Sequence, residues 1–258
     1  MTEVVSLEVV DRVAHVTIER PEKRNAMDLE VFAQLAERAG EIATDPEVGA
    51  VVVAGRGGVF SSGFDVSLFT GQVEHGLDPE FVARLQAAFT VYEELDVPVI
   101  AALEGYCFGA GLQFALACHL RAVAPGARLS VMEVTWGLVP DLGATWRLPR
   151  LVGLGRSTEL VLTARQVLAE EALELGLAEV SLPQDRAQDA AHELAAKLAA
   201  GPGALRRVPR LLRENHGRDR QSALAREVAV QTEVMAGPDF REAVTARVED
   251  RAPRFHGQ

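Results

Sequence analysis

The sequence predicts a mixed α/β fold in which repeated β-β-α units fill residues 1–200 and helices fill residues 201–258. Two apolar runs, Val4–Val10 and Val13–Glu19, flank a short polar turn and indicate a hairpin of two strands. A helical pattern follows, and after it the unbroken apolar run Ala50–Ala54 is typical of a strand buried on both faces. Strand, helix and strand in this order indicate a right-handed crossover unit.

The later elements show apolar residues at helical spacing, with glycine and proline at their ends. Asn25 or Asp28 can cap the first helix. Phe89 and Tyr92 fall on the apolar face of a later helix, so we expect them in the core rather than around a ligand. A mobile loop is expected over Gly71–Asp78. Further helices are expected over Glu80–Leu95, Leu112–Cys118, Val152–Ala164, Val167–Leu175 and Arg186–Ala200, a strand is expected to end at Ile100–Leu103, and breakers at 201–203 and 237–238 bound the last helices.

Composition and charge favour a soluble, cytoplasmic protein. The 258 residues carry a formal net charge of −11, which disfavours binding to nucleic acid or to anionic membranes through overall charge. No apolar run approaches the roughly 18 residues of a membrane span, and the N-terminus lacks the pattern of a secretory signal. Cys107 and Cys118 are too few for a disulfide framework and are expected to be reduced core residues. No set of Cys, His and Glu has the spacing of a metal site.

The stretch Glu104–Leu148 carries the candidate chemistry. Gly105, Gly109 and Gly111 punctuate a turn between a buried strand and an apolar helix. Amides in the first turn of a helix have no intrahelical acceptor and lie at the positive end of the helix dipole. A negative charge that develops beside Ala110, such as that of a carbonyl oxygen turning into an enolate, would be stabilised there.

Two carboxylates follow in the same stretch. Glu133 lies in an apolar segment, and Asp141 lies between a proline and a leucine. Carboxylates in apolar surroundings tend to have raised pKa values, as a group that transfers protons near neutral pH requires. On spacing alone, the pattern favours ordinary turn or cap roles for both residues over a catalytic role. The glycine-serine loop Gly55–Phe69 likewise either is a surface turn or presents the backbone N–H of Phe64 to a ligand.

The chain resembles the enoyl-CoA hydratase/isomerase, or crotonase, superfamily in three ordered segments, RPEKRNAM, FSSGFDVSLF and GYCFGAGLQFALACHLRAVAPGARLSVMEVTWGLVPDLGATWRLPRLVG. The ending DFREAVTARVEDRAPRF is similar to the C-terminal helix and tail of that family, so the likeness runs from Val4 to Phe255. It implies a crotonase-like spiral core with an acyl-CoA site over residues 1–200, and a helical region over residues 201–258 that packs homotrimers or dimers of trimers. The substrate is then a coenzyme A thioester, and no metal or redox cofactor is required.

The resemblance also implies roles for individual residues. The backbone N–H groups of Phe64 and Ala110 would bind the thioester oxygen, although many relatives carry glycine at the second position. The residues that line the site would be Gly109, Gly111, Gln113 and Trp136. Coenzyme A would contact two loops through Arg24, Asn25, Ala26, Met27, Ser62, Gly63 and Asp65.

The carboxylate pattern favours an isomerase. Hydratases of the family use two glutamates at the positions of Gln113 and Glu133, and a neutral amide cannot accept a proton as a glutamate does. The frame from Glu133 to Asp141 is similar to that of the dienoyl-CoA isomerases and of the ring-opening isomerases of phenylacetate breakdown. We therefore expect Glu133, assisted by Asp141, to shift a double bond of an enoyl- or dienoyl-CoA through an amide-stabilised enolate. A hydratase in which Gln113 holds water is the alternative enzyme, and a non-catalytic acyl-CoA-binding subunit is the alternative of another class.

Overall fold

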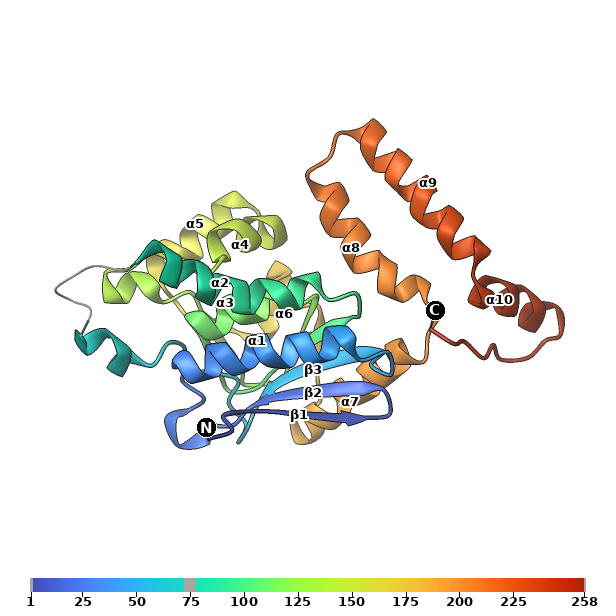
Figure 1. The fold of residues 1–258 in the computed structure, drawn as a ribbon. Helices are drawn as coiled ribbons and strands as arrows, with labels where there is room; N and C mark the ends of the chain where they lie inside the picture. The colour runs from blue at the N-terminus through green and yellow to red at the C-terminus, as the bar shows by residue number, and fades with distance from the viewer. Residues whose placement is uncertain (1, 72–77, 258) are drawn as a thin grey trace.

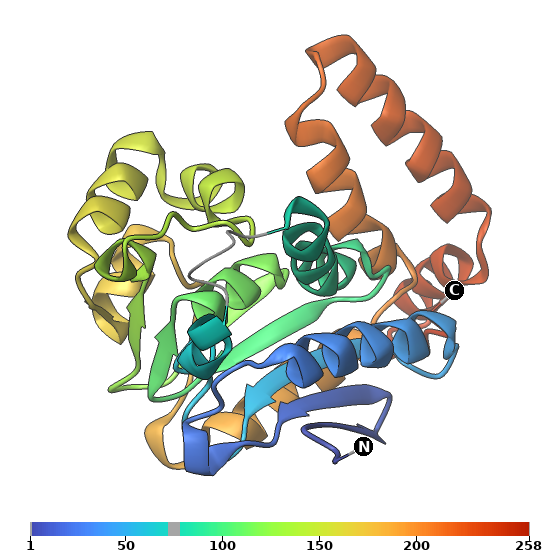
Figure 2. The same ribbon diagram turned by 60° about the vertical axis from the view of Figure 1, so that its left-hand side comes forward.

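A twisted sheet of mostly parallel strands forms the centre of the fold in the computed structural model, which describes residues 2–71 and 78–257 (Figures 1 and 2). Within these residues the strands lie in the order β1-β2-β3-β4-β6-β9. Their bounds are Val5–Val10, Val13–Ile18, Ala50–Gly55, Val99–Leu103, Leu120–Val123 and Val180–Ser181. The first two strands pair antiparallel and confirm the predicted hairpin, and every later pair is parallel.

A second, smaller sheet lies beside the first and turns the fold into a spiral. It contains β5 (Tyr106–Phe108), β7 (Arg128–Ser130) and β8 (Val167–Leu168). After β4 the chain enters β5, and after β6 it enters β7, so successive strands alternate between the two sheets before a helix follows. Ser61, which follows β3 in the chain, forms an isolated bridge with Cys107 of β5, so the chain passes from the large sheet to the small one here as well. This architecture confirms the expected spiral of β-β-α units.

Helices cover both faces of the large sheet. On one face lie α1 (Leu29–Thr44), α2 (Pro79–Glu94) and α3 (Ala110–Ala117), and on the other lies α7 (Ala187–Ala199). Val51 and Val53 pack in the core with the first three helices, whereas Val52 and Ala54 pack against α7. Side chains of a strand alternate between faces, so both faces of β3 are apolar because both are covered.

The predicted helix ends and core aromatics are largely confirmed. Asp28 caps α1 by accepting a hydrogen bond from the N–H of Val31 at 3.1 Å. Phe89 and Tyr92 are fully buried, and the Tyr92 hydroxyl donates to the backbone oxygen of Leu35 at 2.9 Å. The aromatic rings of α2 therefore belong to the core. Residues 72–77 of the expected mobile loop lie outside the described residues.

The segment after α3 differs from the prediction. The helix expected over Val152–Ala164 is present as α5 (Leu154–Thr163), but α4 (Ala144–Val152), which precedes it and meets it at Gly153, was not expected. The sequence hides α4 because Pro149, normally a helix breaker, lies inside it. A helix was also expected over 167–175, where β8 precedes α6 (Ala169–Leu175). Short 3-10 turns complete the chain at Pro21–Lys23, Val66–Gly71, Glu133–Trp136 and Gln184–Arg186.

The C-terminal region forms a helical arm that extends from the body (Figures 1 and 2). It consists of α8 (Ala204–His216), α9 (Arg220–Ala236) and α10 (Pro238–Val248). The tail returns to the base of the arm, where the Asp239 carboxylate accepts the N–H groups of Gly203 and His256, each at 2.8 Å. Within the described part of the chain, no helix is long and apolar enough to cross a membrane.

Candidate active site

A loop between β3 and α2 forms a parallel β-bridge with the segment before α1, with Phe64 paired to Met27. The N–H of Met27 donates to Gly63 O at 2.8 Å, and the N–H of Asp65 donates to Met27 O at 2.9 Å. Successive amides of an extended chain point to opposite sides. The N–H of Phe64 therefore faces away from Met27.

The same loop lies directly against the start of α3. Ser61 bonds to β5 on both sides, and Gly63 follows with a φ of 100°, in the left-handed region that favours glycine. A methyl group built on Gly63 would lie 2.9 Å from Phe108 O and 3.6 Å from Ala110 N. The close approach brings the amides of Phe64 and Ala110, both predicted to hold a thioester oxygen, to one cavity.

Glycines allow α3 to begin where it does. Gly109 has a φ of 51°, and it precedes Ala110, whose N–H is the first of the helix. A methyl on Gly111 would lie 2.7 Å from the Cβ of Ser61, a distance that side chains do not tolerate. The three-residue turn therefore packs backbone against backbone and directs the positive end of α3 at the cavity.

Gln113 and Glu133 form one hydrogen-bonded pair behind these amides. Gln113 Nε2 donates to Glu133 Oε1 at 2.7 Å. Gln113 Oε1 accepts two backbone N–H groups, from Leu142 at 2.9 Å and from Ala144 at 3.1 Å. The orientation of the carboxamide is thereby fixed, with its oxygen on the 142–144 turn and its NH₂ group on Glu133.

The other oxygen of Glu133 is unpaired. Glu133 is only 8% exposed, and its buried Oε2 has no hydrogen-bond partner among the described residues. Burial raises the pKa of Glu133, and the nearby charge of Asp141 raises it further, while the hydrogen bond from Gln113 lowers it. A carboxylate with one free oxygen and a raised pKa has the properties of a general base.

These residues surround a cavity of about 170 Å³. It is lined by Ser62, Gly63, Phe64, Val66, Phe108, Gly109, Ala110, Met132, Glu133, Trp136 and Leu138. Glu133 is the one ionisable side chain in this described lining. The sequence analysis named the polar and glycine members but not Val66, Phe108, Met132 and Leu138, whose apolar side chains carry no motif.

Asp141 lies apart from this cavity. It lines a neighbouring cavity of about 480 Å³ that also contains Thr90 and Glu93. Burial raises the pKa of Asp141, and its charge influences Glu133, so the two carboxylates are within electrostatic range of each other. The structure thus brings Glu133 to the cavity of the two amides and places Asp141 in a separate cavity within electrostatic range of Glu133.

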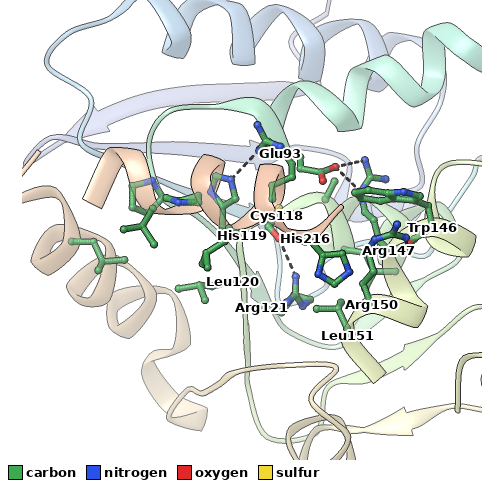
Figure 3. A pocket seen from close by; sticks show the side chains of 18 of the residues that line it. Glu93, Cys118, His119, Leu120, Arg121, Trp146, Arg147, Arg150, Leu151 and His216 are labelled. Carbon is green, nitrogen blue, oxygen red and sulfur yellow. Dashed lines mark hydrogen bonds and ion pairs between the residues drawn. The ribbon is translucent and has the colours of Figure 1, made fainter. Parts of the chain in front are cut away.

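A further cavity, beside the arm, offers no unpaired carboxylate among the described residues that line it. That cavity, of about 440 Å³, lies between α4 and α8 (Figure 3). Its one lining carboxylate in the described chain, Glu93, is paired with Arg147 at 2.7 Å. Volume alone therefore does not identify the reactive site.

Known proteins resemble the chain over its whole length. The sequence model of a family described as enoyl-CoA hydratase/isomerase matches residues 8–258. The chain belongs to the enoyl-CoA hydratase/isomerase family. This confirms the superfamily and the fold that the motifs indicated.

Among the relatives in the enoyl-CoA hydratase/isomerase family, some are named hydratases and others isomerases. A probable enoyl-CoA hydratase of Bacillus subtilis is 32% identical over 257 residues, covering 98% of this chain and 99% of the relative. The mitochondrial Δ(3,5)-Δ(2,4)-dienoyl-CoA isomerase of Rattus norvegicus is 38% identical over 204 residues, covering 73% and 61%. A putative enoyl-CoA hydratase of Streptomyces coelicolor A3(2) has a similar structure, with a TM-score of 0.93, 34% identity and coverage of 99% and 95%.

Structures of this family also include one with a thioester ligand. A putative enoyl-CoA hydratase of Thermobifida fusca, solved in complex with acetoacetyl-CoA, has a TM-score of 0.83 and 34% identity, covering 90% of this chain and 95% of that one. The fold and the family are thus established, whereas the choice between hydration and isomerisation depends on the residues of this chain.

The two loops that the family resemblance assigned to coenzyme A differ in what they expose. Arg24 is exposed and its guanidinium lies 5.7 Å from the centre of the Tyr106 ring. Ala26 and Ser62 are half-buried. Met27 is fully buried. The first loop can therefore offer a ligand the Arg24 guanidinium and backbone groups. Met27, being buried, can offer only its backbone.

Two polar residues of these loops serve the fold. The side-chain amide of Asn25 is fully buried and donates to Arg56 O at 2.9 Å. Asp65 accepts hydrogen bonds from Ser67, Lys23 and Arg20, which together lower its pKa. Both side chains are thus already hydrogen-bonded within the protein. Their contacts with coenzyme A stay a prediction. In the described residues, no group of three His, Cys, Asp or Glu side chains is placed to hold a metal.

Proposed function

We propose that this protein binds an acyl-CoA thioester and shifts a double bond of its acyl group. The Thermobifida fusca structure with acetoacetyl-CoA supports a thioester ligand at this fold. In this chain, the amides of Phe64 and Ala110 would hold the thioester oxygen beside Glu133. Donors fixed in advance at a developing enolate oxygen stabilise it without reorganisation during the reaction.

The orientation of Gln113 carries the preference for isomerisation. Both acceptor sites of its oxygen are used by the amides of Leu142 and Ala144, and one N–H is used by Glu133. Gln113 therefore has one remaining N–H and no capacity to accept a proton. The cavity thus holds a single base, which suits a reaction that removes a proton and returns it.

The proposed reaction is internally balanced. For a 3-enoyl-CoA, Glu133 Oε2 removes a proton from C2, and the electron pair of that bond moves onto the thioester oxygen as a dienolate. The protonated carboxyl then returns the proton to C4, and the double bond forms between C2 and C3. For a dienoyl substrate the second carbon is more distant, and a protonated Asp141 would deliver its proton there. Glu133 would then release to solvent the proton it took up, and Asp141 would take one from solvent, so that both carboxyls return to their starting states. No metal or redox cofactor takes part in these steps.

Hydration of a 2-enoyl-CoA is the second candidate. It is favoured by the names of relatives, which include the probable enoyl-CoA hydratase of Bacillus subtilis and a 2,3-dehydroadipyl-CoA hydratase of Escherichia coli that is 32% identical over 252 residues. The remaining N–H of Gln113 could hold the oxygen of a water molecule. Glu133 alone would then serve both as base and as acid.

Three substrates separate these possibilities. The purified protein would be incubated with 2-enoyl-, 3-enoyl- and 3,5-dienoyl-CoA of equal chain length, and products would be identified by mass and ultraviolet spectrum. We expect products of unchanged mass from the second and third substrates to form faster than the product heavier by one water from the first. Faster hydration would overturn the isomerase proposal, and binding without any product would indicate the non-catalytic subunit.

A further inference from the structure

Hydrogen bonds from Arg147, called the brace below, hold the 142–144 turn that contacts Gln113. The turn that donates two amides to Gln113 is held on its other side by Arg147 of α4, whose Nη1 donates to Leu142 O at 3.2 Å. Gly143, with a φ of 103°, lies against this guanidinium, and a methyl group there would collide with it. The turn is therefore fixed between Gln113 on α3 and Arg147 on α4.

Arg147 is itself anchored to α2. Its Nε and Nη2 donate to one oxygen of Glu93 at 2.9 and 2.7 Å (Figure 3). Nη2 also donates to Thr90 Oγ1 at 3.2 Å. The two charged side chains are only 7% and 16% exposed. A second tie from α2 runs from Gln86 Nε2 to Asp141 O at 2.5 Å. Three helices thus converge on one short turn.

We propose that Arg147 is a positioning residue for the base, acting on Glu133 through Leu142 and Gln113. This inference rests on the proposed role of Glu133. Arg147 is not among the residues that line the cavity of Glu133, so it acts by holding the turn rather than by touching the substrate. The chain of contacts is continuous from α2 to the free oxygen of Glu133.

The brace decides which end of the carboxamide faces the base. With both amides of the turn in place, the Gln113 oxygen is held away from Glu133 and its NH₂ group donates to Oε1. If the turn shifts, that preference weakens, and a rotated carboxamide would place its oxygen against the carboxylate. Loss of the hydrogen bond from Gln113 to Glu133 then raises the pKa of Glu133. It also leaves the carboxylate free to move away from the position in which Oε2 can accept the substrate proton.

The test compares Arg147→Lys with Arg150→Lys. Lysine at position 147 keeps the charge but lacks the planar fork that reaches Glu93 and Leu142 together. We expect kcat to fall about 10- to 100-fold with KM nearly unchanged, since a misplacement of about 1 Å can cost about 10²-fold. Arg150 lies one turn further along α4, stacks on Trp146 and contacts no part of the 141–144 turn among the described residues, so Arg150→Lys should retain full activity.

The decisive readout is the titration of the Glu133 carboxyl in the substrate-free protein. The carbonyl stretch of a protonated carboxyl would be followed by infrared difference spectroscopy, with Glu133→Gln identifying the band. We expect Arg147→Lys to raise this pKa, and Gln113→Leu to raise it without a further increase in the double variant. This measurement is independent of the reaction catalysed, so it stands even if the protein proves to be a hydratase.

Two outcomes would overturn the proposal. In one, Arg147→Lys loses activity but the Glu133 titration does not move, so the substitution acts on folding alone. In the other, the effects of Arg147→Lys and Gln113→Leu on the titration add in full, so the two residues act separately. If Arg147→Lys does not fold, Glu93→Gln weakens the same anchor while keeping its shape, and the same two criteria apply.

Discussion

Gln113 Nε2 lies 2.7 Å from Glu133 Oε1, and the opposite end of the same carboxamide is held by the amides of Leu142 and Ala144. A neutral side chain is therefore locked, in a single orientation, against the one carboxylate of the cavity. It occupies one oxygen of that carboxylate and leaves the other buried without a hydrogen-bond partner among the described residues. Gln113 thus fixes Oε1 of Glu133, and Oε2 is the oxygen left to accept a proton.

The first prediction concerns the base. Glu133→Gln keeps the size and the hydrogen bonding of the side chain but removes its basicity. We expect turnover to fall about 10²- to 10⁴-fold, the usual contribution of a proton-transfer group. Affinity for coenzyme A, measured by calorimetry, should be retained because the amides and the loops are untouched. A variant with undiminished turnover would contradict the assignment of the base.

The second prediction is the acid limb of activity. Proton removal requires ionised Glu133, so kcat/KM should rise with pH through the pKa of this group in the free enzyme. Burial raises that pKa above the ordinary 4.5, and the limb should therefore lie at a higher pH than for an exposed glutamate. A profile of kcat/KM from acid to neutral pH checks this, with circular dichroism as a control for folding. A limb at the ordinary value would show that Glu133 titrates as a solvated group.

The third prediction separates the two carboxylates. Asp141 lies in the neighbouring cavity and not in the lining around Glu133. Asp141→Asn should therefore leave the conversion of a 3-enoyl-CoA, in which the proton moves a short distance, nearly intact. It should slow a 3,5-dienoyl-CoA markedly more, because the second carbon is distant. An equal fall in kcat/KM for both substrates would contradict the proposed role of Asp141 in delivering the proton.

Much of the fold could be predicted because its signals are local. The amphipathic pattern of α1 and the unbroken apolar run of β3, buried on both faces, depend on residues that are neighbours in the sequence. The strands β5 and β7 have three residues each, too few for an alternating pattern to be visible. They are defined by pairing with each other, by the bridge of β5 to Ser61 and by the pairing of β7 with β8.

The site was predictable in its types of residue but not in its arrangement. The glycines around Ala110 and the position of Glu133 are visible as motifs. The anchoring of Gln113 by Leu142 depends on residues 29 positions apart, and no local pattern indicates it. Likewise, no local pattern indicates that Asp65, predicted to contact coenzyme A, pairs with Arg20 across the loop at 3.1 Å.

The fourth prediction concerns the arm. Its helices expose large apolar side chains, including Leu212 at 67%, Val228 at 66% and Val248 at 82%. We expect the full chain to form trimers or dimers of trimers, in which such surfaces are covered. Sedimentation at micromolar concentration should show this, and Val228→Asp should weaken the assembly. Val10→Asp, on the exposed hairpin, is the control and should leave it intact, whereas a monomeric wild type would contradict the prediction.

The last prediction restores the two-glutamate pattern. In Gln113→Glu, one carboxylate oxygen would accept the amides of Leu142 and Ala144, and the other would face Glu133 at the present hydrogen-bond distance. Two carboxylates so close cannot both ionise readily, so the pair should share a proton and titrate in two separated steps. One member could then orient and activate water while the other supplies a proton.

We therefore expect Gln113→Glu to increase the rate of 2-enoyl-CoA hydration relative to 3-enoyl-CoA isomerisation by at least about tenfold, which is below the roughly 10²- to 10⁴-fold that a well-placed proton-transfer group contributes. Gln113→Met, which fills similar space without a polar group, is the matched control and should increase neither rate, because it supplies no second acid and releases the turn. Both rates are measured on the same preparations, so a difference in the amount of folded protein cancels from their ratio. If the ratio is unchanged in Gln113→Glu, the neutral residue at this position does not decide between the two reactions.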